Sequence, residues 1–124
     1  RTTAVRVIND SSAATRIEFR VPSADTNPHS ALAMCIAAGL WGIENRITPP
    51  EKRDDDCYAS AGLPEALFPS DLTAAADRLA ASETARAVFG DAFVENYAFV
   101  CRQEDLSFRK TVSAWERRRY LETV

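Results

Sequence analysis

The stretch from Arg16 to Arg20 reads R-I-E-F-R and alternates charged with apolar side chains. Side chains two residues apart point to the same side of a β-strand, so an extended backbone separates the charged residues from the apolar ones. Successive charged side chains then lie roughly 6.6 Å apart. The apolar face, which Val21 continues, is suited to a core. The charged face forms either a solvated ladder or the lining of a site for phosphate, carboxylate and metal.

The N-terminal part of the chain predicts a second strand beside this one. Residues 3–8 (T-A-V-R-V-I) have strand character, and the polar residues 9–14 predict a loop. The alternating strand spans residues 15–21, and Pro22 ends it. Two strands are too few for a stable sheet by themselves, so we expect them to belong to a larger sheet.

A long helix follows the second strand. Asn27 is the expected N-cap, and Pro28 takes the first helical position. The pair Pro49-Pro50 stops the helix. Between these signals, apolar residues recur every three to four positions and predict one buried stripe. They are Leu32, Cys35, Ile36, Gly39, Leu40 and Ile43.

Residues 48–70 predict a long surface loop, because they hold prolines and the acidic run from Asp54 to Asp56. Further helices follow it. The expected elements are an alanine-rich helix capped by Ser70 with Leu72, Ala75, Ala76 and Leu79 inward, a short helix over 83–89 ended by Gly90, a helix over 91–105 with Phe93, Tyr97 and Cys101 on one face, and a last helix starting at Thr111 with Trp115 and Leu121 as anchors. The prediction is an α+β fold, with two antiparallel strands followed by four or five helices.

Length and charge exclude several classes of protein. The 124 residues correspond to one domain, and a net charge of −3 gives no sign of a general nucleic-acid or membrane-surface binder. No apolar run approaches the ~20 residues of a membrane span. The odd number of cysteines lacks metal-type spacing, which favours a reducing cytoplasm. Cys35 and Cys101 are expected in the core, whereas Cys57 lies in a polar stretch.

Several segments occur in an order that resembles the C-terminal part of the catalytic region of the glutamine synthetase family. They are R-T-T-A-V-R-V at 1–7, R-I-E-F-R at 16–20, D-T-N-P-H at 25–29, A-A-G-L-W-G-I-E-N at 37–45, P-P-E at 49–51, L-P at 63–64 and W-E-R-R-R-Y at 115–120. The resemblance covers residues 1–124 and implies a segment of a larger catalytic domain that lacks its N-terminal β domain. His29 departs from the family pattern, which has tyrosine there, and we assign it a capping or packing role rather than a catalytic one.

The resemblance implies an ATP-dependent ligase. Members phosphorylate the γ-carboxylate of glutamate with ATP, and ammonia or an amine then displaces phosphate from the γ-glutamyl phosphate. The implied cofactor is Mg²⁺ or Mn²⁺, and the implied assembly is a homo-oligomeric ring. The residues that choose ammonia or a larger amine are mostly outside this chain, which we expect to be inactive alone. Tyr58 lies near a tyrosine that some members modify, but we expect an ordinary loop tyrosine.

The resemblance also implies roles for five residues. Arg1 contacts the transferred γ-phosphate, Arg6 and Arg16 hold the nucleotide phosphates, Glu18 binds the metal, and Arg20 binds the substrate carboxylate. Guanidinium groups and divalent metals stabilise the negative charge that develops in such a reaction.

Two of these residues also have a simpler interpretation. In it, Arg6 is a strand arginine exposed to solvent, and Glu18 only balances the charge of its two arginine neighbours. The alternative for the whole chain is a non-catalytic glutamine-synthetase-like module with a structural or interaction role.

Overall fold

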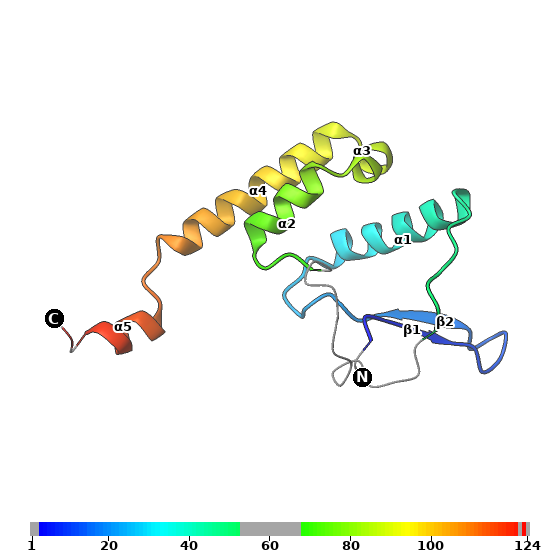
Figure 1. Ribbon diagram of the computed structural model, residues 1–124, viewed down its shortest axis with the longest axis horizontal. Helices are drawn as coiled ribbons and strands as arrows, with labels where there is room; N and C mark the ends of the chain where they lie inside the picture. The colour runs from blue at the N-terminus through cyan, green and yellow to red at the C-terminus, as the bar shows by residue number, and fades with distance from the viewer. Residues whose placement is uncertain (1–2, 53–67, 122, 124) are drawn as a thin grey trace. The chain divides into compact units, whose positions relative to one another are not determined.

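The computed structural model describes residues 3–52, 68–121 and 123, which form two compact units divided between Leu63 and Pro64. Two antiparallel strands precede five helices along the chain, which confirms the predicted α+β fold (Figure 1). The first unit holds both strands and one helix, and the second unit holds the other helices. Arg1, Cys57 and Tyr58 lie outside the described residues, so their expected roles stay predictions.

The two strands, β1 (Val5–Ile8) and β2 (Arg16–Phe19), pair as an antiparallel hairpin. Both are shorter than predicted at their ends. Residues 6 and 18 are directly opposite in the register, and so are residues 8 and 16. The backbone N–H of Arg20 donates to the carbonyl of Ala4 at 2.8 Å, so the pairing between the two strands continues one residue beyond the end of β2. The hairpin therefore carries its charged residues from both strands on one face.

The apolar face of the hairpin is exposed, so the expected core on this side is wrong for the described residues. Val7 is 65% exposed and Ile17 opposite it is 70% exposed. Phe19 and Val21 are also exposed. The buried strand residue is instead Ile8, at 9% exposure, which lies opposite Arg16. A two-stranded sheet buries an apolar face only when another layer covers it, and no described element of the first unit does so.

The first helix, α1 (Pro28–Glu44), begins as predicted. The side-chain oxygen of Asn27 accepts hydrogen bonds from the backbone N–H groups of His29 and Ser30 at 3.0 and 3.2 Å. His29 takes part in this cap through its backbone N–H, which agrees with the predicted capping position. Asn27 thereby satisfies two N–H groups that the first turn of a helix leaves unpaired.

Backbone geometry ends α1 ahead of the proline pair. The N–H of Ile47 donates to the carbonyl of Gly42 at 2.9 Å, and the N–H of Arg46 donates to that of Ile43 at 3.1 Å. These two bonds form a Schellman motif, which needs a left-handed residue after the helix. Arg46 takes that position with φ of 50°, although glycine is the usual residue there.

The predicted apolar stripe of α1 is also exposed. Leu32, Ile36 and Ile43 are 63%, 62% and 75% exposed. Cys35 is the member of the stripe that is partly buried, and it shares the partly buried side of the helix with Met34 and Trp41, which are outside the stripe. The stripe has helical periodicity, as predicted, but no other described residue of the first unit covers it.

The second unit is built around α2 (Leu72–Ala80) and α4 (Asp91–Arg109), which pack side by side and are connected through α3 (Glu83–Phe89) (Figure 1). Ala76 of α2 is 2% exposed, and Val94 and Ala98 of α4 are fully buried. The small alanine side chains allow the two helix backbones to approach closely. This interface is the core of the second unit.

Polar and charged side chains fix the register between these helices. The hydroxyl of Thr73 donates to Asp105 at 2.6 Å, and the guanidinium of Arg102 pairs with Asp77 at 2.6 Å. The residue numbers rise along α2 as they fall along α4, so the helices are antiparallel. At the other end, Arg86 of α3 donates to the Ala80 carbonyl at 2.9 Å and pairs with Asp91 and Glu95 of α4 at 2.7 and 3.2 Å.

Helix boundaries in this unit differ from the sequence prediction at two N-caps. Asp71, rather than Ser70, caps α2, and its carboxylate accepts from the N–H of Ala74 at 2.8 Å. This bond lowers the pKa of Asp71. Ser113, rather than Thr111, caps the last helix, α5 (Ala114–Tyr120). In both places two residues able to cap stand close together, and the sequence does not distinguish them.

Other helix predictions have mixed outcomes. The end of α3 at Gly90 is confirmed, and the φ of Gly90 is 81°. The ring of Phe93 on α4 lies 5.6 Å from that of Tyr97, which confirms a shared face. Trp115 and Leu121, the expected anchors of α5, are 60% and 77% exposed, so that expectation is wrong. Among the described residues, no helix combines the length and apolarity needed to cross a bilayer.

The carboxylate of Asp105 gives the second unit an expected pH dependence. Its side chain is 12% exposed, and the hydrogen bonds from Thr73 and then Arg109 hold its pKa below the ordinary 3.8. Between the folded pKa and the ordinary pKa of 3.8, the unfolded state therefore binds more protons than the folded state. The contribution of Asp105 to stability is complete above pH 3.8 and is lost as the pH falls through the folded pKa.

We expect Asp105→Asn to lower the free energy of unfolding at neutral pH and to flatten its decline below pH 3.8. Urea unfolding, followed by circular dichroism from pH 6 to pH 2, measures both effects. Glu104→Gln is the matched control, because this neighbouring carboxylate is exposed. An acid profile that Asp105→Asn leaves as steep as in the wild type would contradict the assignment.

Candidate functional site

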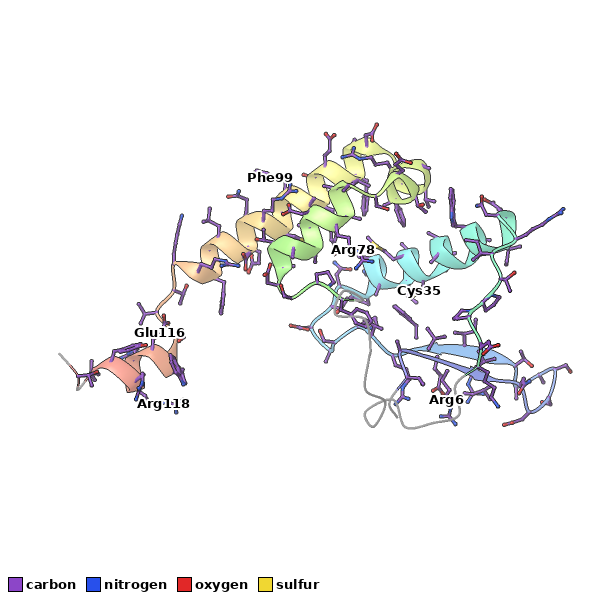
Figure 2. All side chains as sticks on the ribbon, viewed as in Figure 1. Arg6, Cys35, Arg78, Phe99, Glu116 and Arg118 are labelled. Atoms are coloured by element: carbon purple, nitrogen blue, oxygen red, sulfur yellow. The ribbon has the colours of Figure 1, made fainter. Side chains whose placement is uncertain are left out.

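Three charged side chains meet on the hairpin and form what we call the Glu18 cluster: Arg6, Arg16 and Glu18. The Nη1 atom of Arg6 lies 3.6 Å from Oε2 of Glu18, and the Nη2 atom of Arg16 lies 4.0 Å from Oε1. Each carboxylate oxygen therefore faces a different guanidinium. Arg6 comes from β1 and is labelled in Figure 2, whereas the other two residues come from β2.

The hairpin register assembles the cluster. Arg6 and Glu18 are cross-strand partners, and Arg16 precedes Glu18 by two residues on the same strand face. The turn between the strands also holds Arg16, whose Nη1 donates to the carbonyl of Ala14 at 3.0 Å. Ala14 is fixed in turn by its N–H, which donates to the carbonyl of Ser11 at 3.1 Å.

Arg20 occupies the next position on the charged face by strand alternation. Among the described residues it forms no ion pair with Glu18. Of its two neighbours on the same strand, Glu18 therefore pairs with Arg16 and not with Arg20 among the described residues, and its role in charge balance stays an alternative. The partner on the other side of the carboxylate is Arg6. Arg1 lies outside the described residues, so its place relative to the cluster stays a prediction.

The cross-strand pair between Arg6 and Glu18 is the contact that was missed from the sequence. A signal for it exists, because Val5 and Val7 must share a face with Ile17 and Phe19 if both apolar sets lie on one side. Arg6 then shares the opposite face with Glu18. The face of each residue does not say which residue of β1 lies opposite Glu18. That depends on the register of the hairpin, which the geometry of the turn sets.

The cluster can attract an anion and offers one ligand to a metal. Two guanidiniums against one carboxylate leave a net positive charge, and the side chains of Arg6 and Arg16 are 60% and 58% exposed. The Glu18 side chain is 36% exposed. No hydrogen bond among the described residues ends on its carboxylate, so its oxygens are available to a hard cation.

A complete metal site is absent from the described ranges, which contain no group of three or more His, Cys, Asp or Glu side chains arranged to hold an ion. Glu18 alone still suits Mg²⁺, which proteins often bind through one or two carboxylates with water and substrate phosphates. The donor set of the described residues therefore fits a shared metal site. A metal held by Glu18 would take its other ligands from the substrate, from water or from residues outside the described ranges.

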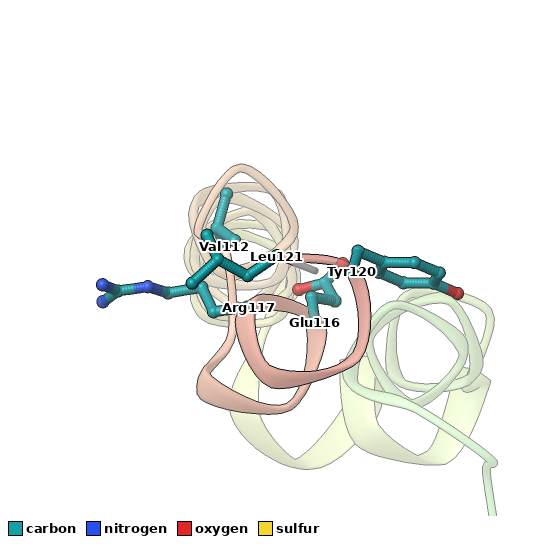
Figure 3. Close-up of a pocket in the computed structure, with 5 residues that line it drawn as sticks. All are labelled: Val112, Glu116, Arg117, Tyr120 and Leu121. Atoms are coloured by element: carbon teal, nitrogen blue, oxygen red, sulfur yellow. The ribbon is translucent and has the colours of Figure 1, made fainter. Parts of the chain in front are cut away.

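A second candidate location lies on α5, but its one carboxylate is already hydrogen-bonded. Val112, Glu116, Arg117, Tyr120 and Leu121 line an open hollow of about 320 Å³ (Figure 3). The carboxylate of Glu116 is already engaged, because it accepts the N–H of Ser113 at 2.7 Å in a capping box. None of the residues that the sequence predicts for a site lies here.

The cysteines do not form a reactive centre in the described residues. Cys35 and Cys101 are free and half-buried, in partial agreement with the expectation that they pack as small apolar residues. Burial raises the pKa of the Cys101 thiol, which disfavours the nucleophilic thiolate.

Comparison with known protein families identifies the class of this chain. Residues 1–120 match the family model described as glutamine synthetase, catalytic domain. This match covers the hairpin, the Glu18 cluster and all five helices that the structure describes. The chain therefore belongs to the glutamine synthetase family.

Curated relatives match the whole chain at moderate identity. A glutamate–isopropylamine ligase of a Pseudomonas species is 36% identical over 126 residues, which cover 100% of this chain and 27% of the relative. A gamma-glutamylethanolamide synthetase of Streptomyces coelicolor is 38% identical over 124 residues, covering 100% and 26%. A type-1 glutamine synthetase of Dictyostelium discoideum is 37% identical over 128 residues, covering 100% and 24%. The chain spans about a quarter of the length of these relatives.

Proposed function

We propose that this chain belongs to an enzyme that joins ammonia or an amine to the γ-carboxylate of glutamate, with ATP as co-substrate and γ-glutamyl phosphate as intermediate. The observation that carries the proposal is the Glu18 cluster, in which two arginines and one accessible carboxylate share one face of the hairpin. Relatives named as glutamine synthetases and as glutamate–amine ligases support the same reaction class.

Each residue has a role that suits its chemistry. Arg6 and Arg16 bind nucleotide phosphates, because guanidinium groups make strong charge-assisted hydrogen bonds to phosphate oxygens. Glu18 binds Mg²⁺ or Mn²⁺, and the metal supplies positive charge to the transferring phosphoryl group. Arg20 binds the substrate carboxylate at the end of the same face, and Arg1 contacts the γ-phosphate.

The complete reaction needs more than this chain. Relatives are about four times as long, since the matched part is 24–27% of their length in the three compared above. One carboxylate cannot fill the coordination shell of Mg²⁺. We therefore assign the activity to a longer protein in which residues 1–124 are the C-terminal segment of the catalytic domain. We further propose that the longer protein is a homo-oligomeric ring and that the isolated chain is inactive.

For the second substrate we propose a class of amines rather than one compound. The relatives' names include isopropylamine and an ethanolamide beside glutamine synthetases. These names share glutamate or a glutamyl group joined to ammonia or an amine, and they differ in the group on nitrogen. We propose ammonia or a small primary amine as the second substrate.

Calorimetric titration of the full-length protein with ATP tests the proposal. With Mg²⁺ present, we expect Glu18→Ala to lower the affinity for ATP at least tenfold, because the metal loses a protein ligand. With glutamate and an amine added, the wild type should release phosphate from ATP. Equal ATP binding by both proteins would instead make the cluster a structural ladder and favour a non-catalytic module.

A further inference from the structure

We propose that Glu18 is also an internal counter-ion, which occupies Arg6 and Arg16 until a metal takes the carboxylate and frees both guanidiniums for phosphate. The inference rests on the proposed function, and it adds a coupling between metal and anion within the hairpin itself. Metal binding at Glu18 then does two things. It adds positive charge near the phosphates, and it removes the carboxylate that competes with them.

The geometry of the cluster suits such an exchange. Oε2 of Glu18 faces Arg6 at 3.6 Å, and Oε1 faces Arg16 at 4.0 Å, so a single carboxylate engages both arginines. These distances are those of ion pairs without direct hydrogen bonds. Exposed ion pairs of this kind are weak, so a bound metal or phosphate displaces them at little cost.

The arginines have few competing partners. Within the described ranges, Glu18 is the one acidic side chain in ion-pair distance of either Arg6 or Arg16. Arg16 also donates from Nη1 to the Ala14 carbonyl, which keeps its guanidinium on the cluster side of the turn. Removing the charge of Glu18 therefore leaves both guanidiniums without an acidic partner among the described residues, and Arg16 keeps its bond to the Ala14 carbonyl.

Thermodynamic linkage makes this coupling reciprocal. If a metal at Glu18 strengthens anion binding by the arginines, an anion at the arginines strengthens metal binding by the same factor. Part of the coupling is independent of direct contact between metal and phosphate, because it arises from the released ion pairs. That part can be measured without any metal.

The test is titration of the full-length protein with inorganic tripolyphosphate in the presence of a chelator. We expect Glu18→Gln, which removes the charge and keeps the shape, to bind tripolyphosphate roughly threefold to tenfold more tightly than the wild type. Asp10→Asn is the matched control, because it removes one negative charge from the exposed hairpin loop without touching the cluster. We expect it to change the affinity less than twofold. In an Arg6→Met background, the gain from Glu18→Gln should shrink.

The outcomes separate this inference from the proposed function. A gain in metal-free binding, together with weaker ATP binding when Mg²⁺ is present, supports both. Unchanged or weaker tripolyphosphate binding by Glu18→Gln overturns the counter-ion role, whereas the loss of Mg²⁺-dependent ATP binding would still support the proposed function. An equal gain from Asp10→Asn also overturns it, because the effect would then reflect net charge alone. Unchanged Mg²⁺-dependent binding would contradict the proposed function.

Discussion

Replacing both Arg6 and Arg16 by methionine is expected to weaken binding of ATP with Mg²⁺ by about 100-fold to 1000-fold in the full-length protein. The estimate takes roughly 1.5–2 kcal/mol for each lost charge-assisted interaction. Methionine keeps much of the side-chain length and removes the guanidinium. Both arginine side chains are more than half exposed, so the change leaves the core intact. Calorimetric titration measures the loss.

Arg118→Met combined with Arg119→Met is the control for this prediction. It removes the same two positive charges from α5, in the second unit, where both residues are exposed. We expect less than a threefold effect on ATP affinity. If the control weakens binding as much as the hairpin variant, the arginines act through general charge. If neither variant changes the affinity, Arg6 and Arg16 do not bind the nucleotide.

Local signals explain why much of the fold is predictable from the sequence. The start of α1 depends on the side chain of Asn27 and on two N–H groups within three residues, so the information is contained in a short segment. Gly90 ends α3 for a similar reason, since its positive φ suits glycine. The alternation from Arg16 to Arg20 likewise assigns each side chain to a face of the hairpin without knowledge of the rest of the molecule.

Burial was less predictable, because it depends on what covers a face. The stripe of Leu32, Ile36 and Ile43 has the correct periodicity but is exposed, and so is the face with Ile17. Periodicity shows which side of a helix or strand is apolar, but not which segment packs on it. Within the first unit, no described residue covers these surfaces.

The candidate site was predicted in the same partial way. Alternation placed Glu18 between Arg16 and Arg20, but the structure pairs it with Arg16 and, across the strands, with Arg6, and Arg20 is not in the ion pairs that are described. A charged residue on a strand face has neighbours on its own strand and across the ladder. Only the register decides between them, and register is a property of two segments.

The largest stability effect is expected from Ala98→Asp, which should destabilise the second unit by about 3–5 kcal/mol, because it buries an unpaired charge. Ala98 is fully buried on α4, one turn after the equally buried Val94, and α4 packs against α2. The close approach of the two helices leaves a carboxylate no access to water. Urea unfolding and hydrogen exchange of the backbone amides in α2 and α4 measure the loss.

Ala92→Asp makes the same substitution on the same helix and serves as the control. Ala92 is exposed in the first turn of α4, where a negative charge interacts favourably with the helix dipole. We expect its stability to stay within about 0.5 kcal/mol of the wild type. If both variants unfold at the same urea concentration as the wild type, α2 and α4 do not form a buried interface at Ala98. A selective loss of exchange protection in Ala98→Asp would place the core of the second unit between these two helices.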